Sequence, residues 1–195
     1  MKEQGRIAAT IPILVAILAV CLSLPARAGD ELWLRLKSEP NMVVLMRHTH
    51  ASGGNALAWD QSGACKGELV LSAKGKAHAK RIGARFAAHG IAPLSVSSPM
   101  CRCLQTAEIA FGGARIVDPE LRQVADADAE RVQAHNAKAQ AILASHRGST
   151  PIVFVSHRPN IDQLTMELLE DGDLLVGTIN EAGEVEVQGK IVIAP

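Results

Sequence analysis

Two histidines stand directly after apolar segments that read as buried strands. Residues 42–46 (MVVLM) lead into Arg47 and His48, and residues 151–156 (PIVFVS) lead into His157. Uninterrupted apolar runs of this length are typical of strands that are covered on both faces. A neutral imidazole can act as a nucleophile and a guanidinium binds oxyanions, so the pattern indicates chemistry on an anionic substrate.

The segments between and around these two strands alternate in the same way. Further strands are expected at 94–97 and 114–117, with a hairpin from 174–180 and 184–193; helices are expected at 31–38, 73–89 (capped by Ser72), 98–111 (capped by Ser98), 126–146, and from a capping box of Asn160 and Gln163. Strands that alternate with helices form right-handed crossovers and a parallel sheet between helix layers. The sequence therefore predicts an α/β three-layer sandwich with a mainly parallel central sheet, helices on both faces and a C-terminal β-hairpin.

A third cation follows the strand expected at 94–97. A serine and a proline there predict the start of a helix, and Arg102 falls within the first turn or so of it. Ligands of open α/β sheets bind beyond the carboxyl ends of the strands. If the three strands are neighbours, Arg102 shares one crevice with Arg47, His48 and His157. Guanidinium groups bind phosphate oxygens in pairs, so a compact dianion such as phosphate fits this crevice best.

A metal site is the alternative interpretation, because His48, His50 and His157 could supply three imidazole ligands. A dication would lie beside Arg47 and Arg102, and no carboxylate is expected at these strand ends to offset the repulsion. We therefore expect no metal and no cofactor, and we interpret His50 as a residue of the rim.

The bulk charge excludes some classes of partner. The 195 residues carry 20 basic and 20 acidic side chains, so nucleic acid is not an expected partner. Residues 1–28 begin with Lys2 and Arg6, continue with an apolar run and end in Ala-Arg-Ala, which predicts a signal peptide cleaved after Ala28. A retained membrane anchor stays open, because the uncharged run could just span a bilayer. With cleavage, residues 29–195 form one catalytic domain, periplasmic or secreted, without stable membrane insertion.

Three cysteines follow this segment, and an oxidising compartment would allow two of them to pair. Cys101 and Cys103 point to different faces of the expected helix and are poor partners for each other. Cys65–Cys101 is the favoured pair and Cys65–Cys103 the alternative, while three free, buried thiols remain equally open.

Four stretches together resemble the histidine phosphatase superfamily, in its phosphoglycerate-mutase-like branch. They are LMRHT (45–49), LSAKGKAHA (71–79), SSPMCRCLQTA (97–107) and VSHRPNI (155–161). The resemblance implies that His48 attacks phosphorus and becomes a phosphohistidine that water hydrolyses. It implies further that Arg47 and Arg102 hold the phosphoryl oxygens and that His157 is another donor. Small periplasmic members assigned to heptose phosphates of the lipopolysaccharide core look most similar, and phosphohistidine phosphatases are another close relation. The implied substrate is thus a small phosphorylated compound, such as an envelope sugar phosphate or phosphohistidine.

The sequence departs from the family at the proton donor. The family places a glutamate soon after the arginine helix, where this chain has Gln123, and an amide cannot donate a titrating proton. Asp126 is the candidate replacement, although Asp126 and Asp128 could equally cap the next helix. Without an acid, substrates with good leaving groups are favoured, or the domain binds a phosphorylated ligand without turnover. A mutase is less favoured because an exported protein would lack glycolytic substrates.

Overall fold

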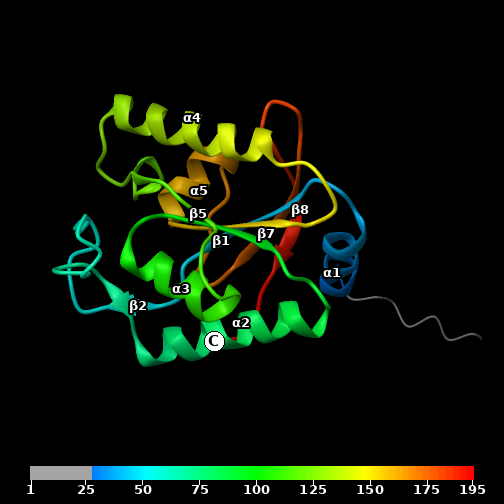
Figure 1. Ribbon diagram of the computed structural model, residues 1–195, viewed down its shortest axis with the longest axis horizontal. Helices are drawn as coiled ribbons and strands as arrows, with labels where there is room; N and C mark the ends of the chain where they lie inside the picture. The colour runs from blue at the N-terminus through cyan, green and yellow to red at the C-terminus, as the bar shows by residue number, and fades with distance from the viewer. Residues whose placement is uncertain (1–27) are drawn as a thin grey trace, which may run out of the picture.

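The computed structural model describes residues 28–195, which fold around one six-stranded sheet (Figure 1). Its elements are α1 (Ala28–Ser38), β1 (Met42–Arg47), β2 (Ala51–Ser52), β3 (Val70–Leu71), α2 (Ala73–Ala88), β4 (Leu94–Ser97), α3 (Cys101–Phe111), β5 (Ile116–Val117), a 3-10 turn (Pro119–Leu121), α4 (Ala129–Ser145), β6 (Ile152–Ser156), α5 (Arg158–Thr165), β7 (Leu174–Ile179) and β8 (Val185–Ile191). The predicted signal peptide or anchor lies outside the described residues and stays a prediction.

The strand order of the sheet is β5-β4-β6-β1-β7-β8. The first four strands are parallel, whereas β7 is antiparallel to both β1 and β8. The predicted mainly parallel sheet with a C-terminal hairpin is confirmed. The hairpin lies beside β1, which places the strand that carries the first histidine in the interior of the sheet.

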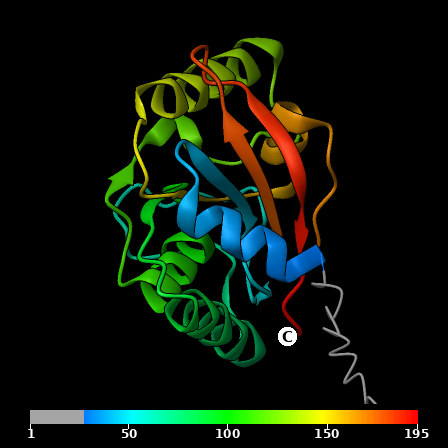
Figure 2. The same ribbon diagram turned by 90° about the vertical axis from the view of Figure 1, so that its right-hand side faces the viewer.

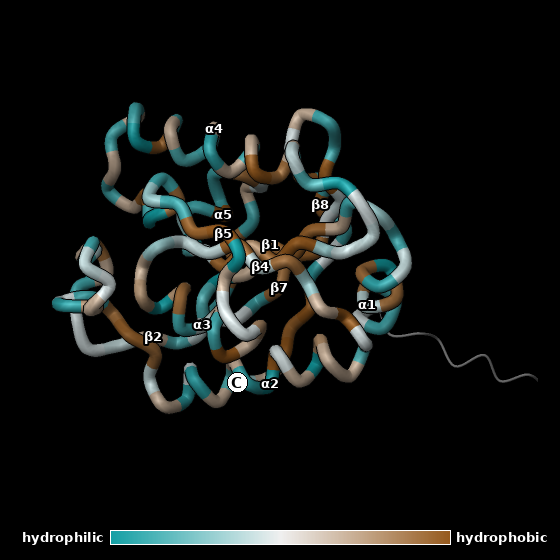
Figure 3. Tube along the Cα trace, viewed as in Figure 1, coloured by the Kyte–Doolittle hydropathy of each residue, from teal (hydrophilic) through white to brown (hydrophobic). Residues whose placement is uncertain are grey.

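Helices cover both faces of the sheet, as predicted (Figures 1 and 2). Helices α1, α2 and α3 pack on one face, where Trp33, Ile82 and Cys103 meet Val44 and Met46 of β1. Helices α4 and α5 pack on the other face against the alternate residues of the same strands. Residues 42–46 are all fully buried, and the central strands form the most apolar part of the molecule (Figure 3). This packing explains why β1 is an uninterrupted apolar run.

Two predicted helix starts are wrong, and each error has the same physical reason. Helix α3 begins at Cys101 after Met100, and Ser98 lies outside it with its hydroxyl bonded to His157. Helix α5 begins at Arg158 with His157 as its N-cap, so Asn160 lies inside the helix and forms no capping box. Both polar side chains bond tertiary partners, and Ser98 also accepts from the N–H of Met100 over 3.3 Å, one residue before the helix. Ser72 and Asp128 do cap α2 and α4.

No helix within residues 28–195 has the combination of length and apolarity that a membrane crossing requires.

Candidate active site

The carboxyl ends of three neighbouring parallel strands bring the predicted residues together. Arg47 is the last residue of β1 and pairs in register with Ser156, the last residue of β6. The backbone N–H of His48 donates to the carbonyl of Ser156 over 3.0 Å, and His157 follows directly. On the other side of β6, Ser98 donates its N–H to Val155 over 3.0 Å.

A cavity of about 390 Å³ opens at this edge of the sheet. Its walls contain the four predicted residues Arg47, His48, Arg102 and His157, together with His50, Gln123, Arg158, Asp171, Ala51, Ala56, Leu69 and Pro159. His50 lines this cavity and is half-buried, with its Nδ1 2.8 Å from the hydroxyl of Ser72, and its place at the rim stays a prediction. A larger cavity of about 560 Å³ beside α2, α3 and β5 contains neither a histidine nor an arginine, so we assign the chemistry to the smaller one.

His48 is a neutral imidazole with a defined tautomer. Its Nδ1 lies 2.9 Å from the carbonyl of Thr49, which can only accept, so Nδ1 carries the proton. Its Nε2 accepts from Nε of Arg102 over 3.1 Å. Burial, together with the nearby charges of Arg102 and Arg47, lowers the pKa of His48 to about 3. The ring is therefore uncharged near neutral pH, and Nε2 keeps the unprotonated lone pair that a nucleophile requires.

His157 lies behind His48, with 5.4 Å between the ring centroids. Its Nε2 is 2.7 Å from the hydroxyl of Ser98, and the free thiol of Cys103 lies 3.6 Å from the same nitrogen. Complete burial, followed by the charge of Arg102, holds the pKa of His157 well below its usual value. A bound dianion would offset that burial and favour the protonated, donating form.

The two arginines carry buried N–H groups that no described residue satisfies. Nη2 of Arg102 donates to the carbonyl of Ala56 over 3.1 Å and to Oε1 of Gln123, whereas Nη1 is buried and has no partner within residues 28–195. Nε of Arg47 is likewise buried and has no hydrogen-bond partner among the described residues. Unsatisfied buried donors are costly, and two of them on cations at one cavity indicate an anion-binding site.

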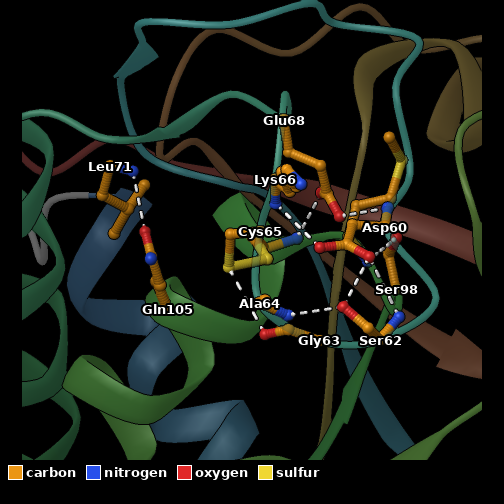
Figure 4. The surroundings of a disulfide bond; sticks show 12 residues. Asp60, Ser62, Gly63, Ala64, Cys65, Lys66, Glu68, Leu71, Ser98 and Gln105 are labelled. Carbon is orange, nitrogen blue, oxygen red and sulfur yellow. Dashed lines mark hydrogen bonds between the residues drawn. A yellow bond between two sulfur atoms is a disulfide. The ribbon is translucent and has the colours of Figure 1, made fainter.

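A disulfide fastens the loop between β2 and β3 to the helix that carries Arg102 (Figure 4). Cys65 and Cys101 are bonded, with 5.7 Å between their Cα atoms, so the favoured pairing is confirmed and Cys103 is free and buried. The buried carboxylate of Glu68 accepts from the N–H groups of Asp60 and Cys101, each over 2.8 Å. The loop is thus bonded twice to Cys101, the residue before Arg102.

The proposed acid Asp126 is not part of this cavity. It is exposed in a turn, where its φ is 57°, and it is not among the described residues that line the cavity. Its neighbour Asp128 caps α4 by accepting from the N–H of Arg131 over 2.8 Å. Gln123 does line the cavity, where its Oε1 accepts from Nη2 of Arg102.

Sequence reasoning missed one carboxylate at these strand ends. Asp171 lines the cavity and forms an ion pair of 2.9 Å with Nη2 of Arg47. The expectation that no carboxylate stands there is therefore wrong. The available signal was the acidic run at 170–173 directly before β7, because an antiparallel β7 brings its N-terminal flank to the carboxyl end of β1.

Comparisons with known proteins bear on the family and the fold. Residues 43–130 match the model of the histidine phosphatase superfamily (branch 1). No curated protein matches the chain. Among solved structures, the protein histidine phosphatase SixA complexed with tungstate is 20% identical, with a TM-score of 0.55 over 77% of this chain and 96% of that one. Phosphoglycerate mutase from Thermus thermophilus is 19% identical, with a TM-score of 0.54 over 78% and 99%. Phosphoserine phosphatase from Entamoeba histolytica, in complex with 3-phosphoglyceric acid, is 13% identical, with a TM-score of 0.52 over 78% and 97%. At these identities the likeness shows a shared fold.

Proposed function

We propose that this chain, whose residues 43–130 match the histidine phosphatase superfamily, is a metal-independent phosphatase that forms a phosphohistidine at His48. The observation that carries the proposal is the hydrogen bond from Nε of Arg102 to Nε2 of His48. It fixes an unprotonated, buried nucleophile in a cavity lined by cations.

The first step transfers the phosphoryl group to the protein. The unpaired N–H groups of Arg47 and Arg102 hold the phosphoryl oxygens and stabilise the charge that spreads over them in the transition state. Nε2 of His48 forms a bond to phosphorus as the bond to the leaving group breaks. The hydrogen bond from Nδ1 to Thr49 stabilises the positive charge that the ring gains. Water then attacks phosphorus and restores the imidazole.

The substrate we propose is a small phosphomonoester or phosphoramidate, with an envelope sugar phosphate and phosphohistidine as the two candidates. The structural neighbours support a small phosphorylated ligand, because one is a protein histidine phosphatase and another is a phosphoserine phosphatase in complex with 3-phosphoglyceric acid. We place the protein in the cell envelope. The apolar, small-x-small N-terminal segment and the Cys65–Cys101 disulfide support an oxidising, exported location.

A second candidate function follows from Gln123. Its side chain accepts from Arg102 in the place where the family has its acid, so the domain could bind a phosphorylated ligand without turning it over.

The deciding experiment measures turnover of aryl phosphates, sugar phosphates and phosphohistidine in the presence of EDTA. We expect activity in the wild type and a loss of more than about a thousandfold in His48→Ala. His146→Ala is the matched control, because this histidine caps the carboxyl end of α4 and is not part of the cavity. Phosphate binding without turnover of any substrate would refute the enzyme and favour the binding module. Activity that EDTA abolishes and zinc restores would refute the metal-independent mechanism.

A further inference from the structure

We infer that Asp171 is the general acid of this site and supplies the proton that Gln123 cannot. The inference rests on the proposed phosphatase function. Asp171 is the only carboxylate among the residues that line the cavity in the described chain, and it lies on the loop between α5 and β7. Strands β6 and β7 flank β1 on opposite sides, so Asp171 approaches the site from the β7 side. In the sequence it is far from the segment that carries Gln123.

A tight turn holds Asp171 in place. The N–H of Asp173 donates to the carbonyl of Glu170 over 3.0 Å, which closes a β-turn with Asp171 and Gly172 at its centre. Gly172 has φ of 79°, and a Cβ there would lie 2.3 Å from Cε1 of His78, so the turn requires glycine. The turn is also hydrogen-bonded to β1, because the N–H of Gly172 donates to the carbonyl of Arg47 over 3.2 Å. The carboxyl group is therefore fixed relative to the phosphate-binding arginine.

The contacts of Asp171 leave one oxygen available. Oδ1 pairs with Nη2 of Arg47 at 2.9 Å, the side chain is 31% exposed, and Oδ2 accepts no hydrogen bond from the described residues. The charged and titratable groups around it, on its own loop and on the elements packed against it, are Arg47, His50, Lys74, His78, Arg158, Glu170 and Asp173. A phosphoryl group held by the same guanidinium would therefore lie beside this carboxyl group, where a leaving oxygen can meet it.

The other carboxylates near the site do not meet these requirements. Both oxygens of Glu68 are bonded to backbone N–H groups. The side chain of Glu170 is 76% exposed, lies 3.6 Å from Arg47 and is not part of the cavity. Asp126 is exposed in a different loop, as described above.

The proton balance closes over the two steps. As Nε2 of His48 bonds to phosphorus, the bond to the leaving oxygen breaks, that oxygen keeps the electron pair, and it takes the proton of Asp171. The resulting carboxylate then takes a proton from the water that attacks the phosphohistidine. The nitrogen–phosphorus bond breaks with its electron pair returning to Nε2, and Asp171 is protonated again.

A leaving-group series tests this role. For the wild type, Asp171→Asn and Asp171→Glu, kcat/KM is measured with 2,4-dinitrophenyl, 4-nitrophenyl, phenyl and alkyl phosphates, and the Kd of inorganic phosphate is measured by calorimetry. We expect Asp171→Asn to slow the alkyl phosphate by about 10² to 10⁴, to change the dinitrophenyl phosphate by less than about threefold, and to bind phosphate at least as well. Asp171→Glu should recover part of the loss, since it keeps an acid. Glu170→Gln is the control for charge beside Arg47, and any effect it has should be equal across the series.

The alternative role for Asp171 is to position Arg47. A loss of equal size for every leaving group, together with weaker phosphate binding, would overturn the inference in favour of that role. No change in any rate would overturn it as well. A wild type that hydrolyses phosphohistidine but none of the esters would overturn the inference alone. A wild type that hydrolyses neither would overturn the proposed phosphatase function, and the inference with it.

Discussion

The disulfide between Cys65 and Cys101 offers the most direct quantitative test of how the site is held together. Its removal by the double substitution Cys65→Ser and Cys101→Ser frees a loop whose ends are 36 residues apart in sequence. The chain-entropy relation for a loop of that length gives a loss of about 4 kcal/mol. For a chain of this size, each kcal/mol corresponds to roughly 2–4 °C, so Tm should fall by about 8–16 °C.

The same change should weaken phosphate binding. The freed loop carries Ala56, whose carbonyl accepts from Nη2 of Arg102, and Glu68, which accepts from the N–H of Cys101. Loss of one hydrogen bond to a charged group is worth about 1.5 kcal/mol, which corresponds to roughly a tenfold rise in the Kd of phosphate.

Scanning calorimetry and phosphate titration with and without dithiothreitol are the assays. The reductant should shift the wild type toward the double variant and leave the double variant unchanged. Cys103→Ser serves as control, because this thiol is buried but unbonded, and it should retain the response to the reductant. A double variant that unfolds within about 2 °C of the wild type would refute the tether, and an unchanged Kd would refute its link to Arg102.

Three further predictions follow from the site. The folded-state pKa of His48 is about 3, below the unfolded value of 6.5, so the unfolded chain binds more protons and the free energy of unfolding falls as pH drops below 6.5. Between pH 7 and 5 the loss measured by urea unfolding should be about 2 kcal/mol. His48→Gln should lose this part of the pH dependence of stability. Arg102→Lys should lower kcat/KM by about 10² to 10³, because one ammonium cannot contact His48, the loop carbonyl and a phosphoryl oxygen together. Asn160→Ala should destabilise the protein by about 2 kcal/mol in chemical denaturation, since it removes buried bonds to the N–H of Val124 and the carbonyl of Arg122.

The strands and their terminal residues were predictable because the signal is local. A strand buried on both faces must be apolar throughout, so the first polar residues after 42–46 and 151–156 mark the edge of the sheet. Parallel neighbours then bring these edges together without any further information. For this reason Arg47, His48 and His157 could be assigned to one cavity from the sequence.

Helix starts were less predictable because a capping residue can have another partner. Ser98 and Asn160 are both good caps by type, yet Ser98 bonds to His157 and Asn160 holds the segment at 122–124. Asn160 thereby positions the chain beside Gln123. The local preference of these side chains is weaker than the need to satisfy buried groups, and that need is visible only when the chain is folded.

The position of Asp171 depends on a choice of topology that no local pattern contains. In a purely parallel sheet, the residues before each strand and the residues after it lie at opposite ends of the strands. Strand β7 runs antiparallel to β1, with Leu174 opposite Met46, so the residues before β7 lie beside the carboxyl end of β1. The hairpin could equally have been added beside β5, at the far edge of the sheet, and its sequence would read the same. Its place beside β1 is what adds a carboxylate to a cavity whose other charged walls are arginines, and it makes acid catalysis possible despite the amide at Gln123.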